Sequence, residues 1–319
     1  MRDVVVIGAG LSGLTAAYEL ERQGVDYTLI EVKRHLGGSI RTVQRAGFTM
    51  DAGAFALADT LDRAWLAQLG LGDALVALDD DSVGFVDGTQ MLIDALSQTL
   101  TAPRLMRMAV SSIGELENGR YGICLENGIL LDARAVIVAV PARYAQRLFY
   151  GYITELTEHL LGYHYDTIHR ISLGFVASAV PDALRNPPDM GYVFNRRTTH
   201  PARVPDGHVL WQFGLRLAPE RVAEAQTLID LVCQRYDLPA PVSQLVSYWG
   251  TADAISCYDD AHSRWVADAR AQLPDGIALI GSDYSHHTPI RRGRTHLDER
   301  ISQGQSAAQA MIDYLEDIS

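Results

Sequence analysis

Three glycines near the start of the chain have a spacing that suits the binding of a diphosphate. Gly8, Gly10 and Gly13 form a G-x-G-x-x-G pattern. The first glycine permits a tight turn, the second lets a pyrophosphate approach the backbone, and the third lets a helix pack closely on a strand. The unpaired N–H groups of such a helix attract negative charge. The pattern predicts a cofactor site that also includes Leu11 and Ser12.

An acidic residue stands where this site needs a partner for a ribose. Glu31 follows Gly8 by 23 residues. A carboxylate there accepts hydrogen bonds from a ribose diol and repels a 2′-phosphate. The predicted site extends to Val32 and Lys33. Lys33 is the only lysine of the chain, and we interpret it as a cofactor contact, with a solvated surface charge as the alternative.

The flanking segments supply the elements that this site requires. Residues 3–8 form a short apolar run rich in β-branched residues, typical of a strand covered on both faces. Residues 14–24 have apolar residues at helical spacing and end at a glycine, and residues 26–31 are predicted to form a second strand. Together they predict a βαβ nucleotide-binding unit. A glycine-rich turn in an ordinary α/β protein is the alternative.

Composition and charge argue against several other classes of protein. The 319 residues are 48% hydrophobic and 21% charged, enough for a sizeable core in one large or two medium domains. A net charge of −12 argues against broad binding to nucleic acid or anionic lipid. No apolar run approaches the roughly 18 residues that span a bilayer. The three cysteines form no CxxC pair, so a reducing cytoplasm is expected.

A second pair of glycines, Gly37 and Gly38, lies between Glu31 and a D-x-G motif. The segments LGGSIRT (residues 36–42) and GFTMDAGAFAL (residues 47–57) resemble the flavin-dependent amine oxidase and protoporphyrinogen oxidase superfamily. The resemblance implies FAD, bound non-covalently, as the cofactor. The residues that it adds to the predicted cofactor site are Gly37, Gly38, Ser39, Arg41, Gly53, Ala54 and Phe55.

Further segments resemble the same superfamily in order, so that the resemblance covers roughly half of the chain. These segments are residues 86–100, 108–141, 248–262 and 276–315. The resemblance implies that Val110 presents backbone groups to the adenine and that Asp283 holds the ribityl chain or the pyrophosphate. The helix near Leu297 would direct its N–H groups at the flavin's pyrimidine carbonyl.

The resemblance also implies an α/β fold with two interleaved domains. A Rossmann-type FAD-binding domain (glutathione-reductase-like, p-hydroxybenzoate-hydroxylase type) is interleaved with a reduced α+β substrate domain. The FAD-binding domain is predicted at residues 1–54, 86–145 and 264–319, and the substrate domain at 55–85 and 146–263. Only about 34 residues separate the D-x-G motif from Gly88, where relatives insert a long segment. The substrate pocket should therefore be shallow, more open, or completed by a partner subunit.

No catalytic residue is identified, and His296 is the single candidate. It precedes the closing helix and could act as an acid or a base near neutral pH, with a helix-start histidine in the core or in water as the alternative. Many amine oxidases of the superfamily place a lysine near the flavin, but here Lys33 lies at the ribose end. The histidines of this region show no metal-ligand spacing, so no metal is expected.

A cluster of arginines precedes the closing helix. Arg291, Arg292 and Arg294 could bind an anionic substrate, because guanidinium groups pair well with carboxylate or phosphate. The alternative is a solvated loop. Cys257 does not fall where some relatives attach their flavin. In the closing motif, Glu299 and Arg300 replace a Gly-Ala pair and must point outward or form a pair.

These observations predict an FAD-dependent oxidoreductase that carries out two-electron oxidation of a C–N or C–C bond in a small organic substrate. Two alternatives stay open. One is oxidation of a dihydronicotinamide dinucleotide in the manner of renalase, a branch close to this chain in size. The other is a flavin-binding partner subunit with little turnover of its own, which a short substrate domain would suit. The oligomeric state is not predicted.

Overall fold

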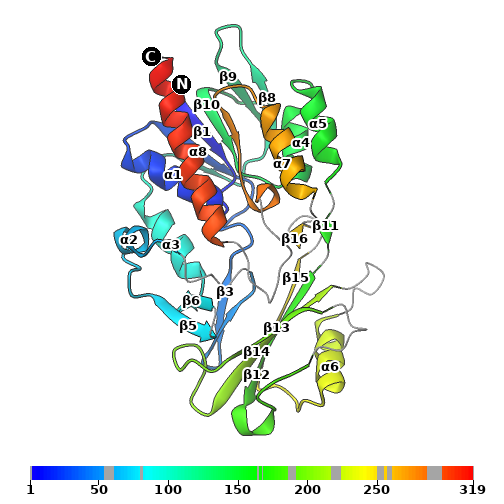
Figure 1. Cartoon of the computed structure of the whole chain (residues 1–319). Coiled ribbons are helices and arrows are strands. Elements are labelled where there is room, and N and C mark those ends of the chain that lie inside the picture. Colours follow the sequence, from blue (N-terminus) through cyan, green and yellow to red (C-terminus); the bar gives the residue numbers. More distant parts are fainter. Residues whose placement is uncertain are drawn as a thin grey trace.

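The fold contains two main β-sheets, which lie one above the other in Figure 1. The computed structural model describes residues 2–53, 61–79, 82–163, 165–166, 168–185, 192–216, 224–249, 255–256, 261–285 and 297–318. The mixed α/β architecture and its Rossmann-type unit confirm the predicted fold class.

The first sheet carries the nucleotide-binding unit. Its strand order is β7-β2-β1-β10-β9-β8, and β17 pairs with β10. Strands β2 and β10 both run parallel to β1, so their carboxyl ends meet at one edge, where ligands bind in open α/β sheets. The strands of this sheet are β1 (Arg2–Ile7), β2 (Tyr27–Glu31), β7 (Arg104–Met106), β8 (Val110–Glu115), β9 (Tyr121–Leu125), β10 (Leu130–Val138) and β17 (Ile277–Leu279).

Helices cover both faces of the first sheet (Figure 1). On one face α1 and α8 pack side by side, with α3 and α2 in the same apolar cluster. A Cβ at Gly304 of α8 would lie 2.6 Å from the carbonyl oxygen of Ser12, so glycine is needed for this close contact. The helices are α1 (Leu11–Arg22), α2 (Arg63–Gln68), α3 (Gln90–Thr99) and α8 (Leu297–Asp317) on this face, and α4 (Ala142–Phe149), α5 (Thr154–Leu161) and α7 (His262–Ala271) on the other.

The second sheet is antiparallel, with the order β13-β14-β12-β15. Along β12, Ile171, Leu173 and Phe175 pack into an apolar cluster with helix α6, and the residues between them point to the opposite face. A Cβ at Gly174 would lie 2.6 Å from the ring of Phe48, so the β3–β4 hairpin lies against that face. The elements are β12 (Ile168–Val176), β13 (Tyr192–Thr198), β14 (His208–Arg216), β15 (Ser243–Trp249), α6 (Ala225–Tyr236), β3 (Thr42–Arg45) and β4 (Phe48–Asp51).

Smaller elements complete the described part of the chain. They are β5 (Leu75–Asp79) with β6 (Ser82–Phe85), β11 (Tyr165–Asp166) with β16 (Ile255–Ser256), and the 3-10 helices η1 (Ala177–Ala179) and η3 (Ser282–Tyr284). Among the helices that the structure describes, none has both the length and the apolar character needed to cross a membrane.

The local elements agree with the sequence-based predictions to within a few residues. Strand β1 matches the predicted strand 3–8, and β2 matches 26–31. Helix α1 begins at Leu11, three residues before the predicted range. The predicted division into two domains stays a prediction. Several apolar residues of 61–85, among them Trp65, Leu66 and Phe85, pack in the same cluster as α1 and α8.

Candidate functional site

The turn after β1 requires glycine at two of the three positions of the glycine motif. Gly8 has a φ of +101°, and a Cβ there would lie 2.5 Å from the carbonyl oxygen of Ala139. A Cβ at Gly13 would lie 1.9 Å from the carbonyl oxygen of Gly8. By contrast, a Cβ at Gly10 would meet no atom within 4 Å. Gly8 and Gly13 are therefore required by packing, whereas Gly10 faces open space that a ligand could fill.

The N-terminus of α1 is prepared for an anion. Gly10 is its N-cap residue and provides no side-chain cap, and the first turn has no acidic residue. The hydroxyl group of Ser12 is buried in that first turn and has no hydrogen-bond partner among the described residues. Uncapped N–H groups and a buried hydroxyl donor at a helix N-terminus are the groups that bind a diphosphate.

Glu31 lies beside the same turn. It is buried, one carboxylate oxygen accepts from the Ala9 N–H at 2.7 Å, and the other accepts from the Lys33 N–H at 2.8 Å. A carboxylate has about four lone-pair directions, so both oxygens can still accept from a ribose. The N–H of Met108 donates to the Glu31 carbonyl at 3.1 Å, which brings Val110, at the start of β8, to this end of the site.

The second glycine pair extends the site away from Glu31. The Gly37 N–H donates to the Ala9 carbonyl at 2.7 Å, and a Cβ at Gly38 would lie 3.2 Å from the Cα of Gly10. Both glycines have positive φ, at +94° and +62°, which residues with side chains rarely adopt. The bare backbone of this pair therefore lies directly against the turn that begins α1.

Gly53 continues this line of backbone. A Cβ there would lie 2.2 Å from the carbonyl oxygen of Ser39, and the N–H of Ala52 donates to the Arg41 carbonyl at 2.8 Å. The side chains of Arg41 and Val32 are exposed. We name the run of residues from Glu31 through Gly10, Gly38 and Ser39 to Gly53 the cofactor cradle.

The D-x-G motif is held by an ion pair that sequence reasoning missed. The Arg203 guanidinium, from the loop between β13 and β14, donates to Asp51 at 2.5 Å, and both side chains are fully buried. The second Asp51 oxygen accepts from the Thr42 hydroxyl at 2.5 Å and from the Thr89 N–H at 2.9 Å. Asp51 thus ties the hairpin, the turn before α3 and the β13–β14 loop together.

Two side chains of the second sheet hold the next two carbonyl groups. The Ser247 hydroxyl donates to the Ala52 carbonyl at 2.9 Å, and the Arg170 guanidinium donates to the Gly53 carbonyl. Arg170 and Ser247 are partners in the register of β12 and β15. Burial lowers the pKa of Arg170 to about 9, although Asp51 partly offsets this and Arg300 adds to it. Sequence reasoning missed both residues; the polar residues that alternate with apolar ones in β12 were the available sign.

Asp283 lies in η3, and its side chain contacts the first residue of α4. One of its oxygens accepts from the Ala142 N–H at 2.8 Å and from the Tyr165 hydroxyl at 2.5 Å. Burial raises the pKa of the Asp283 carboxyl, while these hydrogen bonds and the charge of Arg300 oppose the rise. Leu297, which begins α8, is fully buried. The charge of Arg300 lowers the pKa of both Asp283 and Arg170, so the start of α8 lies near the Gly53 end of the cradle.

Several predicted residues cannot be placed in the site. Those that lie outside the described residues are Ala54, Phe55, Arg291, Arg292, Arg294 and His296. Their predicted roles stay predictions. The described part of the site nevertheless fits an extended dinucleotide, because an uncapped helix N-terminus, a ribose acid and bare backbone follow one another along the cradle.

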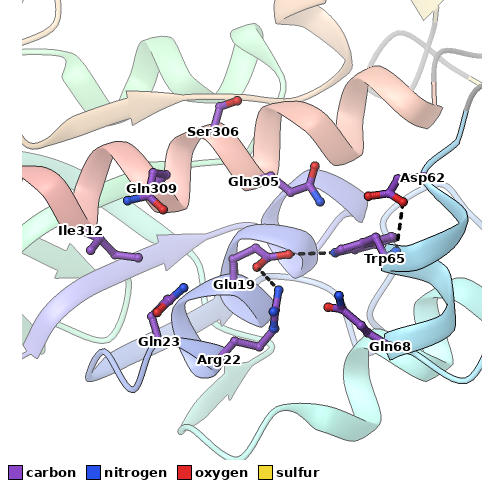
Figure 2. A pocket seen from close by; sticks show the side chains of 10 residues that line it. All are labelled: Glu19, Arg22, Gln23, Asp62, Trp65, Gln68, Gln305, Ser306, Gln309 and Ile312. Carbon is purple, nitrogen blue, oxygen red and sulfur yellow. Dashed lines mark hydrogen bonds and ion pairs between the residues drawn. The ribbon is translucent and has the colours of Figure 1, made fainter.

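A separate surface pocket of about 440 Å³ lies between α1, α2 and α8 (Figure 2). Glu19 accepts from Arg22 at 2.9 Å and from the Trp65 ring N–H at 2.8 Å across it. Its lining residues are Glu19, Arg22, Gln23, Asp62, Trp65, Gln68, Gln305, Ser306, Gln309 and Ile312. None of the predicted cofactor residues lines this pocket.

Two family models match the chain. One is described as flavin containing amine oxidoreductase and matches residues 55–312, well over half of the chain. The other is described as NAD(P)-binding Rossmann-like domain and matches residues 6–69.

Individual relatives match over shorter segments. Protoporphyrinogen oxidase 2, chloroplastic/mitochondrial, of Arabidopsis thaliana is 43% identical over 53 residues, which is 17% of this chain and 10% of that protein. The putative flavin-containing monoamine oxidase AofH of Mycobacterium tuberculosis (strain ATCC 25618 / H37Rv) is 33% identical over 148 residues, which is 46% of this chain and 30% of that protein. The chain therefore spans less than a third of the length of these curated relatives.

Solved structures resemble the whole fold. The crystal structure of a putative protoporphyrinogen oxidase from Exiguobacterium sp. 255-15 covers 99% of this chain and is itself covered to 99%, with a TM-score of 0.76 and 15% identity. At this identity the similarity shows the fold alone.

Proposed function

The chain belongs to the family of flavin containing amine oxidoreductases, which depend on FAD, and we propose that it oxidises a C–N or C–C bond in a small organic substrate by two electrons. FAD supplies the redox chemistry by accepting a hydride equivalent from a substrate carbon. The observation that carries this proposal is the cofactor cradle, which runs from the ribose acid Glu31 to Gly53 beside the second sheet.

Each part of the cradle has its own task in holding FAD. Glu31 accepts hydrogen bonds from the ribose of the adenosine. The N–H groups at the start of α1 and the Ser12 hydroxyl bind the diphosphate, and Gly10, where a Cβ would meet no atom within 4 Å, leaves room for it. Gly53 then lies at the flavin end, between the first sheet and the residues that contact it from the second. Gly53, Arg170 and Ser247 would therefore hold the flavin end of FAD.

The position of Lys33 bears on the mechanism of substrate oxidation. The backbone N–H of Lys33 donates to Glu31, so the only lysine of the chain lies at the ribose end of the cradle. No lysine is left to act at the flavin end. We therefore favour hydride transfer from the substrate without help from a lysine.

Spectroscopy of the purified protein tests the proposal. We expect flavin absorbance in the visible range, released into the supernatant by acid precipitation because the cofactor is held without a covalent bond. Under anaerobic conditions, an amine or a porphyrinogen-type substrate should bleach this absorbance. A protein that takes up no FAD, or that is bleached only by dihydronicotinamides, would contradict the proposed reaction.

The charge of the substrate is a separate question. We propose an anionic substrate on the basis of Arg291, Arg292 and Arg294, whose positions lie outside the described residues. Replacing Arg291 and Arg292 by alanine should raise KM and leave FAD binding unchanged. An unchanged KM would contradict an anionic substrate.

A further inference from the structure

Arg170 is held in a fixed position where the cofactor cradle meets the second sheet. Its side chain is buried, with 3% of its surface exposed, in the middle of a four-stranded sheet. Its guanidinium donates to the carbonyl of Gly53, and Ser247, its partner in β15, holds the neighbouring carbonyl of Ala52. The strand and this pair of contacts together fix the direction of the guanidinium.

The course of the cradle indicates which end of FAD this guanidinium faces. Glu31 marks the ribose of the adenosine, and Gly10 and Gly38 mark the diphosphate. The cradle continues from Gly38 through Ser39 to Gly53, away from Glu31. An extended dinucleotide that is bound by its ribose and diphosphate must therefore direct its flavin half toward Gly53 and Arg170.

We propose that Arg170 sets the reduction potential of the bound flavin, because its positive charge stabilises the negative charge that the ring gains on reduction. The oxidised ring is neutral, and a hydride brings two electrons and one proton, so the ring gains one negative charge. The hydride comes from the substrate carbon, which is oxidised by two electrons. The inference rests on the proposed function only in that FAD must occupy the cradle.

The environment of Arg170 makes its charge effective. A charge interacts more strongly in a poorly solvated interior than in water, and a charged group that is already oriented needs no rearrangement when the reaction occurs. With a pKa of about 9, the guanidinium is protonated at neutral pH. The charge next to a flavin ring is one of the means by which a protein tunes its electronics.

The test compares the flavin reduction potentials of the intact holoprotein and four variants. Arg170→Gln and Arg170→Met remove the charge, and Arg170→Lys keeps it. Ser247→Ala is the matched control, because it removes a hydrogen bond to the neighbouring carbonyl group but no charge. Asp51 keeps its ion pair with Arg203 in all four variants, so no carboxylate is left buried alone. The potentials are measured by equilibrium reduction against a reference dye, which requires no substrate.

We expect both uncharged variants to shift the equilibrium at least tenfold toward oxidised flavin, which equals about 30 mV for a two-electron couple. Arg170→Lys and Ser247→Ala should stay within that tenfold range. Equal potentials in all folded variants would overturn the inference, and so would a shift in Ser247→Ala as large as that in Arg170→Gln. If the unaltered protein bound no FAD, both the inference and the proposed function would fall.

A second measurement uses the unaltered protein, in case the uncharged variants do not fold. Sulfite adds to the oxidised flavin ring and leaves a negative charge on it, so a nearby fixed positive charge favours the adduct. We expect the unaltered holoprotein to form this adduct, with loss of visible flavin absorbance. A holoprotein that binds FAD and forms no adduct would overturn the role of Arg170 but leave the proposed function standing.

Discussion

The βαβ unit of the first sheet contributes mainly backbone to the candidate site, whereas the second sheet and its loops contribute charged and polar side chains. Gly8, Gly10 and Gly13 shape the βαβ unit because they have no side chains, and the N–H groups at the start of α1 have no side-chain cap. The other region provides Arg170 and Arg203, which reach the D-x-G motif.

Substitutions in the two regions should therefore destabilise the protein for different reasons. The backbone part tolerates no added atom where two chain segments touch, because backbone atoms cannot move aside as a flexible side chain can. The side-chain part depends on the pairing of buried charges. Removing one charged side chain leaves its partner buried without an opposite charge, which is unfavourable. Substitutions that separate steric from electrostatic effects can test this contrast.

The largest effect is expected from Gly13→Ala. The new Cβ would lie 1.9 Å from the carbonyl oxygen of Gly8, so we expect a loss of at least about 4 kcal/mol of stability and no bound FAD. The matched control is Gly10→Ala, whose Cβ meets no protein atom within 4 Å. That variant should melt close to the unaltered apoprotein but bind FAD more weakly. Thermal unfolding and FAD titration measure both, and equal melting temperatures for the two variants would contradict the steric argument.

Arg203→Met should have the next largest effect. It leaves Asp51 buried without its ion-pair partner, which typically costs about 3–5 kcal/mol. Arg197→Met is the control, because the Arg197–Asp182 pair is 2.8 Å long but Asp182 is 94% exposed, and exposed pairs contribute about 1 kcal/mol or less. Urea unfolding of both variants gives the comparison. Similar losses of stability would mean that the Asp51 pair has no special importance.

Glu31→Gln should weaken FAD binding, and it also removes one of the two acceptors that the Ala9 and Lys33 N–H groups use. Hydrogen bonds to a charged group contribute about 1.5–3 kcal/mol, so the Kd for FAD should rise roughly tenfold to a hundredfold. Glu19→Gln is the control, since Glu19 lies on α1 but lines the separate pocket of Figure 2. Its Kd should equal that of the unaltered protein. A Kd that Glu31→Gln leaves unchanged would remove Glu31 from the cofactor site.

The smallest effect concerns His169, on β12 of the second sheet. Burial lowers its pKa below the ordinary value of 6.5. The His169 side chain therefore binds a proton more readily in the unfolded chain than in the folded protein. The folded protein keeps its full stability above pH 6.5, and its free energy of unfolding decreases as the pH falls below this value. His169→Gln should make the free energy of unfolding less dependent on pH in this range, whereas the exposed control His35→Gln should not. Identical pH profiles for all three proteins would contradict this prediction.

The sequence predicted the cradle better than its surroundings. The glycine pattern, Glu31 and the D-x-G motif all lie within 53 residues. The first two were singled out from local backbone geometry, and the D-x-G motif from the resemblance. The second sheet was predicted only as part of an α+β substrate domain. Arg170 and Arg203 were not singled out, because charged residues are usually solvated and nothing nearby in sequence marks these two as buried.

The amino-acid sequence by itself determined the βαβ unit, its ribose acid and the backbone openings for a diphosphate. These features depend on φ angles, helix dipoles and side-chain volume within short segments. Only the tertiary structure decided which face of the second sheet meets the D-x-G motif. Arg170 contacts Gly53 across 117 residues and Arg203 contacts Asp51 across 152, and strand alternation defines two faces without stating what covers each. Long-range packing resolves that choice, because it buries one face against α6 and the other against the cofactor cradle.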